Sequence, residues 1–234
     1  MRKTQFAIGE YYHIYNRGVD KRSIFQNPKD LDRFIQSLKE FNTIEPIGSI
    51  YENNYSKKKE KEFGSSTSKS KDKPKPLVDF IAYCLNQNHF HLILEPLIDK
   101  GVEKFMHRIS TGYTKYFNEN NKRSGSLFQG RYKSIHIENN EYLLYLSAYV
   151  NLNNFVHPNL NKSWLLKAQF SSFSQYVFDE QSLISCNTGV TLGQFKTTKE
   201  YKTFAEEVIE IVCKNREIKN LPDFLSLTLE NDTA

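Results

Sequence analysis

Apolar and polar positions along the chain follow two patterns. Short runs rich in Tyr, Ile, Val and Phe, bounded by turn residues, are typical of β-strands. Longer runs repeat apolar residues at helical spacing and are typical of helices with one buried face. In chain order, we expect strands at residues 10–16, 77–85, 89–95 and 131–138, and helices at residues 28–43, 101–120, 140–154 and 198–214.

Capping and turn signals support several of these boundaries. Asn27 followed by Pro28 marks a helix start, and Asn139 or Asn140 is expected to cap the helix that follows the last strand. Residues 86–88, Asn-Gln-Asn, are a turn signal, so the strands at 77–85 and 89–95 should form a hairpin.

The first six elements give the order β-α-β-β-α-β, which is that of the split βαβ fold. The sequence therefore predicts an α+β, ferredoxin-like (RRM-like) domain, with a four-stranded antiparallel sheet and both helices on one face. The other face is expected to be free, with the extra helix at 140–154 near it. We expect this domain to span residues 1–160 and a partly helical C-terminal extension to span residues 161–234.

Residues 52–76 are dominated by Lys, Ser, Glu and Asn, a composition too polar to offset the entropy of ordering. We expect a disordered insertion there. Residues 57–75 carry eight Lys against three acidic residues, which accounts for the whole net charge of +5. Total charge is therefore weak evidence for nucleic-acid binding, and its local distribution has to carry that argument.

Three cysteines lie far apart and form neither a disulfide framework nor a metal-binding pair. No apolar run reaches the roughly 18 residues that a membrane span needs, and the first ten residues lack the apolar stretch of a signal peptide. The expected location is cytoplasmic, with no membrane partner.

His89 and His91 are separated by one residue in a predicted strand, so both side chains should share one face, about 6.6 Å apart. Two such imidazoles can bind one metal ion, although so short a motif is more often a pair of unrelated histidines. On the helix at 140–154, Tyr149 and Asn153 lie one turn apart. Asn153 offers an amide oxygen to a hard cation and Tyr149 offers a phenol nucleophile. Spacing alone leaves open whether this tyrosine reacts or only packs.

Five ordered segments resemble a known family. Residues 88–94 (NHFHLIL) resemble the HUH box, histidine-hydrophobic-histidine, of single-tyrosine transposases, and the nearest group is the REP-associated tyrosine transposases and their insertion-sequence-200-like relatives. The other four are residues 14–18 (IYNRG), residues 125–134 (GSLFQGRYKS), residues 142–153, and Trp164 followed by residues 171–176 (SSFSQY). Together they cover roughly residues 8–180.

This resemblance implies a DNA transposase that nicks and rejoins single-stranded DNA through a 5′-phosphotyrosine. It assigns the nucleophile to Tyr149 and the metal ligands to His89, His91 and Asn153, with Mg²⁺ or Mn²⁺ as the cation. Two positions depart from the family pattern, Gln87 and Asn154, where relatives usually have Pro. Neither position carries a reacting group.

The expected partner is single-stranded or hairpin DNA, bound by a monomer or a homodimer in the bacterial nucleoid. Basic side chains near the predicted chemistry are expected to contact phosphates without reading sequence. These residues are Arg17, Lys104, Arg108, Lys115, Lys122, Arg123, Arg131 and Lys133.

Three other functions are compatible with these residues. A replication-initiator or relaxase-type nickase uses the same histidines and tyrosine, but the segment at residues 125–134 favours a transposase. A domesticated, non-catalytic binder of DNA hairpins would need only the fold. An unrelated metal hydrolase would need more ligands than His89 and His91, and no carboxylate lies in a comparable motif.

Overall fold

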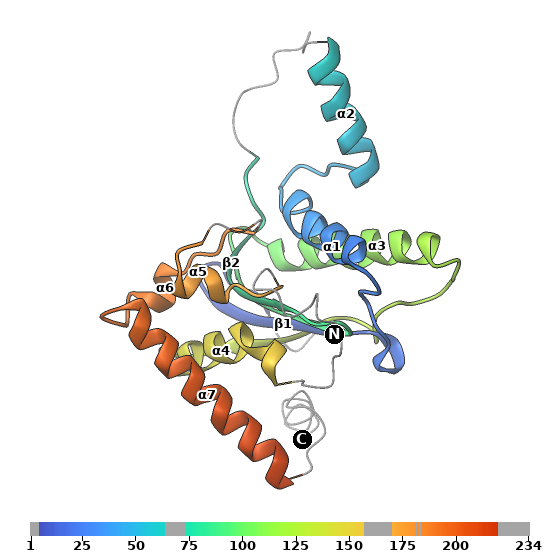
Figure 1. Ribbon diagram of the computed structural model, residues 1–234. Helices are drawn as coiled ribbons and strands as arrows, with labels where there is room; N and C mark the ends of the chain where they lie inside the picture. Colours follow the sequence, from blue (N-terminus) through green and yellow to red (C-terminus); the bar gives the residue numbers. More distant parts are fainter. Residues whose placement is uncertain (1–4, 64–73, 157–169, 181, 183, 220–234) are drawn as a thin grey trace.

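The computed structural model describes residues 5–63, 74–156, 170–180, 182 and 184–219 of the chain (Figure 1). The predicted domain boundary near residue 160 and Trp164 lie outside these residues. None of the helices in the described ranges is long and apolar enough to cross a membrane.

Four strands form one antiparallel sheet, as predicted. They are β1 (Tyr11–Arg17), β2 (Val78–Leu85), β3 (His89–Pro96) and β4 (Lys133–Ile137), and their order across the sheet is β2-β3-β1-β4. This is the strand order of the split βαβ arrangement, so the ferredoxin-like α+β fold is confirmed. The turn between β2 and β3 is closed by the amide of Asn86, which donates to the carbonyl of His89 at 2.8 Å.

One face of the sheet is covered by α1 (Pro28–Glu40) and α3 (Gly101–Asn120). The side chain of Asn27 accepts a hydrogen bond from the amide of Asp30, so the predicted cap of α1 is confirmed. Between the layers, Phe34 packs edge-on against Tyr113 and contacts Phe90 of β3. This aromatic core fixes both helices to the sheet.

The second face is not free, because helices from the C-terminal half cover it (Figure 1). The first of them is α4 (Asn140–Asn151), capped by Asn139 and followed by a 3₁₀ turn at Asn153–Phe155. Behind α4 lies α7 (Thr198–Lys219). The remaining short helices are α5 (Phe173–Val177), α6 (Gly189–Leu192) and a 3₁₀ turn at Val19–Lys21.

The expectation of disorder at residues 52–76 is wrong for its first part, because Ile50–Phe63 form helix α2; residues 64–73 lie outside the described chain. A capping box starts this helix: Ser49 accepts from the amide of Glu52, and Glu52 accepts from the amide of Ser49. Lys57 pairs with Glu40 of α1 at 2.6 Å. The polar composition of this segment did not predict these two hydrogen bonds, although Ser49 and Glu52 form the S-x-x-E signature of a capping box.

Arg108 closes the C-terminal end of α1. Its guanidinium donates to the carbonyl oxygens of Phe41, Thr43 and Ile44, which follow the last turn of that helix. Helix ends leave carbonyl groups without partners, and a cation is a favourable donor there. The side chain predicted to contact DNA is thus engaged in the fold.

We expect Arg108→Met to lower the free energy of unfolding by about 2 kcal/mol, because three carbonyl groups lose a charged donor while an unbranched apolar stem is kept. Lys104→Met is the matched control. Lys104 is exposed one turn earlier on α3, so its loss should change stability by less than about 0.5 kcal/mol. Urea denaturation measures both, and equal stability of the two variants would contradict this role of Arg108.

Candidate active site

Strand register brings the predicted histidines to the sheet face that α4 covers. His91 of β3 lies between Tyr15 of β1 and Cys84 of β2, and His89 lies opposite Arg17. Directly opposite residues of antiparallel strands point to the same face. The rings of His89 and His91 are 5.1 Å apart at nearly right angles. The prediction that both share one face is therefore confirmed.

Four aromatic rings surround the imidazole of His91. His13 and Tyr15 stack on it at 5.1 and 5.9 Å, and His89 and Tyr149 meet it edge to face at 5.1 and 5.7 Å. The Nε2 atom of His13 lies 2.9 Å from Nδ1 of His91. Burial lowers the pKa of His13 to about 3, so this ring is neutral at pH 7. No local pattern in the sequence pairs His13 with His91, because the two residues are 78 positions apart.

Hydrogen bonds to neighbouring groups determine which nitrogen of His89 carries the proton. Asn88 donates its side-chain nitrogen to the carbonyl of Lys21 at 3.2 Å, which orients its amide. The amide oxygen of Asn88 is then 2.6 Å from Nδ1 of His89 and can only accept. Nδ1 is therefore protonated, and Nε2 presents a lone pair. This arrangement suits a histidine that binds a metal ion through Nε2.

Asn153 meets this lone pair from the end of α4. Its Oδ1 is 3.1 Å from Nε2 of His89, and the residue is fully buried. A third side chain, Asn86 of the β2–β3 turn, donates its amide nitrogen to both atoms, at 2.7 Å to Asn153 and 3.0 Å to His89. Sequence analysis treated Asn86 only as a turn residue. Its part in the site depends on α4, which is distant in sequence.

Among the described residues, no group of three or more His, Cys, Asp or Glu side chains is placed to hold a metal ion. The predicted ligands His89, His91 and Asn153 are not such a group, because the side chain of Asn153 is an amide. Nε2 of His89 and Oδ1 of Asn153 are 3.1 Å apart. Neighbouring ligand atoms of an octahedral cation are about 2.9 Å apart when the metal–ligand bonds are about 2.05 Å, so the two spacings agree. These two atoms therefore fit a divalent cation of the size of Mg²⁺ or Mn²⁺.

A buried polar network holds α4 in place above the histidines. Asn151 donates to the hydroxyl of Tyr201 on α7 at 2.7 Å and accepts from the hydroxyl of Ser172. The same Ser172 accepts from the amide of Tyr83 on β2 at 2.9 Å. The helix with Tyr149 is thus bonded to α7 on one side and, through Ser172, to the sheet on the other.

Tyr201→Phe should lower the free energy of unfolding by about 1–3 kcal/mol, because the buried amide of Asn151 and the hydroxyl of Ser147 lose the oxygen that they contact. Tyr51→Phe removes the same atom from a side chain that is 78% exposed and should leave stability unchanged. Thermal or urea unfolding of both variants checks this. A neutral effect at Tyr201 would mean that the network does not hold α4.

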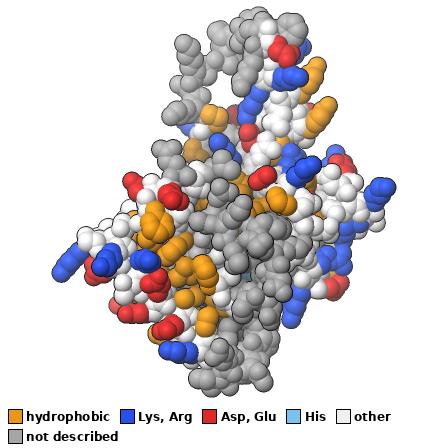
Figure 2. Space-filling view, viewed as in Figure 1, with side chains coloured by type: hydrophobic (Ala, Val, Ile, Leu, Met, Phe, Trp, Pro, Cys, Tyr) orange, Lys and Arg blue, Asp and Glu red, His pale blue; other side chains and the backbone are white. Residues whose placement is uncertain are grey.

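The predicted basic residues are not gathered at this site. Lys104, Arg108 and Lys115 belong to α3, on the opposite face of the sheet, so the expectation that this region borders the chemistry is wrong for them. Figure 2 shows Lys and Arg side chains over the end of α3 and the chain that follows it. Arg123 in that chain donates to Asn118 and Ser126. The positions of Lys104, Arg108 and Lys115 along the chain did not predict which face of the sheet α3 covers.

Two of the predicted cations lie on the same face of the sheet as the histidines. Arg17 is opposite His89 in the sheet and donates to the side chain of Gln129. Lys133 of the edge strand β4 is exposed and lies opposite Tyr15, on the same face. Lys122 and Arg131 are exposed in the chain between α3 and β4.

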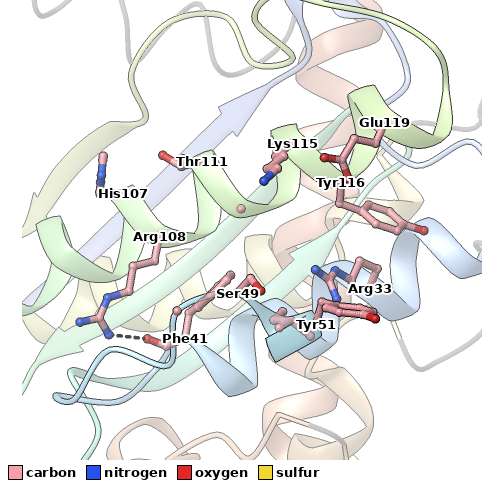
Figure 3. A pocket seen from close by; sticks show the side chains of 13 residues that line it. Arg33, Phe41, Ser49, Tyr51, His107, Arg108, Thr111, Lys115, Tyr116 and Glu119 are labelled. Atoms are coloured by element: carbon pink, nitrogen blue, oxygen red, sulfur yellow. Dashed lines mark hydrogen bonds between the residues drawn. The ribbon is translucent and has the colours of Figure 1, made fainter. Parts of the chain in front are cut away.

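A cavity of about 670 Å³ lies between α1, α2 and α3 (Figure 3). Arg33, Lys115 and Tyr116 line it, with Tyr51 of α2 at its edge. This cavity is on the far side of the sheet from His89 and His91. It is therefore separate from the candidate active site.

Comparison with known proteins agrees with the motifs. Residues 49–153, slightly less than half of the chain, match the family model described as "Transposase IS200 like". No curated protein matches. Among solved structures, the chain is similar to a REP-associated tyrosine transposase bound to a REP hairpin, with 13% sequence identity and a TM-score of 0.46 over 80% of this chain and 91% of the other. The family-model match over residues 49–153 confirms the resemblance to IS200-like transposases.

Proposed function

We propose that this chain, which is related to the IS200-like transposases, cleaves and rejoins single-stranded DNA through a phosphotyrosine at Tyr149. The observation that carries the proposal is the convergence of His89, His91, Tyr149 and Asn153 on one face of the sheet. Histidine and amide donors beside a phenol are the parts needed to bind a cation and attack a phosphate.

In the proposed reaction, the phenolic oxygen of Tyr149 loses its proton and attacks the phosphorus of the scissile phosphate. The bond from phosphorus to the 3′ oxygen breaks, and that oxygen takes up a proton to leave a 3′-hydroxyl. The product is a 5′-phosphotyrosine. Because the ester bond is kept on the enzyme, a 3′-hydroxyl from another strand can reverse the step and join two ends without an external energy source.

A divalent cation, Mg²⁺ or Mn²⁺, held by His89, His91 and Asn153 would polarise the phosphate. Imidazole ligands favour Mn²⁺ in softness. The chain's own residues orient the ligands, since Asn88 sets the tautomer of His89 and the network around Asn151 holds α4 in place. Tyr149 is only 1% exposed, so DNA reaches it only after a rearrangement of the chain around it.

The proposed substrate is a DNA hairpin with a single-stranded flank, the class that the motifs imply. Arg17 and Lys133 are the cations best placed to contact the phosphates next to the cleaved bond, because they share the sheet face of the histidines. Phosphate contacts of this kind position the strand without reading its sequence.

Tyr149→Phe should abolish covalent attachment to DNA while hairpin binding stays within a few-fold of wild type, since only the attacking oxygen is lost. The measurement is a denaturing gel after incubation with Mn²⁺ and a pool of labelled single-stranded hairpins. A labelled band at protein mass is expected for the wild type, and EDTA should remove it.

Tyr145→Phe and Tyr142→Phe are the controls, because both tyrosines lie on the same helix and are partly buried. Both variants should keep the covalent band. If Tyr149→Phe still reacts and one control does not, the nucleophile is the other tyrosine. Binding without any covalent band in the wild type, with either metal, would instead support a domesticated hairpin-binding protein.

Lys133→Glu should reduce the rate of cleavage at low salt by about tenfold or more, because a phosphate contact next to the chemistry becomes a repulsion. Lys104→Glu makes the same change on the opposite layer and should reduce cleavage far less. Single-turnover cleavage at several salt concentrations compares the two. Equal effects of both variants would contradict the proposed path of the strand.

A further inference from the structure

We propose that Asn86 is a further ligand of the divalent cation. This inference rests on the proposed function, because it concerns the same metal site. Asn86 is 2% exposed and belongs to the β2–β3 turn, whereas Asn153 follows α4. Two segments that are distant in sequence, the β2–β3 hairpin with Asn86 and His89 and the turn after α4 with Asn153, thus supply the atoms concerned.

The geometry is a nearly equilateral triangle. The side-chain nitrogen of Asn86 is 2.7 Å from Oδ1 of Asn153 and 3.0 Å from Nε2 of His89, and the last two atoms are 3.1 Å apart. Three ligands on one face of an octahedral cation are separated by about 2.9 Å when their bonds are about 2.05 Å. The three atoms therefore have the spacing of a ligand face.

Hydrogen bonds turn the side-chain nitrogen of Asn86 toward His89 and Asn153 in the structure. Nε2 of His89 and Oδ1 of Asn153 both present lone pairs, and two buried acceptors at this distance repel each other unless a positive group lies near both. The amide NH₂ of Asn86 has two hydrogens and donates one to each acceptor. It supplies the positive charge density that a cation would supply.

When a cation binds, the same side chain can turn its amide by about 180° and present Oδ1 at the corner that the nitrogen held. The amide is nearly symmetric in shape, so this turn needs no change in packing. Among the described residues, Oδ1 of Asn86 accepts no hydrogen bond that the turn would break. After the turn, the thiol of Cys84, which lies 3.8 Å from the position that the nitrogen held, can donate to the oxygen.

Mn²⁺ binding to the full chain in the absence of DNA tests this proposal. Electron paramagnetic resonance of free Mn²⁺ at pH 8 gives the dissociation constant for each variant. Asn86→Leu keeps the approximate size without any ligand atom and should weaken binding by about 10- to 100-fold. Asn86→Asp places an anionic oxygen at the same corner and should strengthen binding by about tenfold or more. Asn120→Asp adds the same charge at an exposed site on α3 and should have no effect.

The opposite outcomes overturn the proposal. If Asn86→Leu binds Mn²⁺ as well as wild type or more tightly, Asn86 only competes with the cation. If Asn86→Leu does not fold, judged by circular dichroism, Asn86→Asp decides, and unchanged or weaker binding by it contradicts a ligand role. Two further results separate this proposal from the proposed function. If the wild type does not bind Mn²⁺, or if His89→Ala binds it as well as the wild type, the cation of the proposed function is refuted. If His89→Ala weakens Mn²⁺ binding but the Asn86 variants do not change it, only the role of Asn86 is refuted.

Discussion

The pairing register of β3 is the constraint on which the candidate site depends. His91 lies between Tyr15 and Cys84, and this alignment turns both histidines toward α4. Shifting the register by one residue would exchange the two faces of the strand. Phe90, Leu92 and Leu94 would then leave the aromatic core beneath α1 and α3. The hydrophobic face of the strand therefore fixes the orientation of the face with the histidines. Removing these apolar side chains from their core would cost free energy, and this cost keeps the histidines in place.

Holding α4 over these histidines requires polar bonds as well as apolar packing. Tyr149 packs in the apolar cluster of that layer, while Asn151, Ser172 and Tyr201 form a buried hydrogen-bonded chain. Apolar contacts alone tolerate sliding and rotation of a helix, whereas satisfied buried polar groups favour one arrangement because any other leaves a group unpaired. The position of the phenol relative to the imidazoles is thus set by bonds from segments that follow it in sequence.

The sequence predicted the parts of the fold and site that depend on local patterns. The four strands, the helices α1, α3, α4 and α7 and the common face of His89 and His91 follow from periodicity and capping. Contacts between distant segments were not predictable in this way. His13 and Asn86 join the site through pairs 78 and 67 residues apart, Arg108 closes a helix end, and the lysines of α3 belong to the other layer. For α2, the capping box was visible in the sequence but was outweighed by polar composition.

Burial of so many polar groups at the candidate active site costs stability. In the described chain, Nδ1 of His13 and Nδ2 of Asn153 are buried without a hydrogen-bond partner, and each such group costs about 1–3 kcal/mol. A hydrophobic core of the same shape would avoid this cost, so stability alone does not explain these residues. The amide of Asn153 presents its oxygen toward His89 and leaves its N–H groups unused. Under the proposed function, a phosphate oxygen would be the acceptor for these N–H groups, while the oxygen of the same side chain would face the cation.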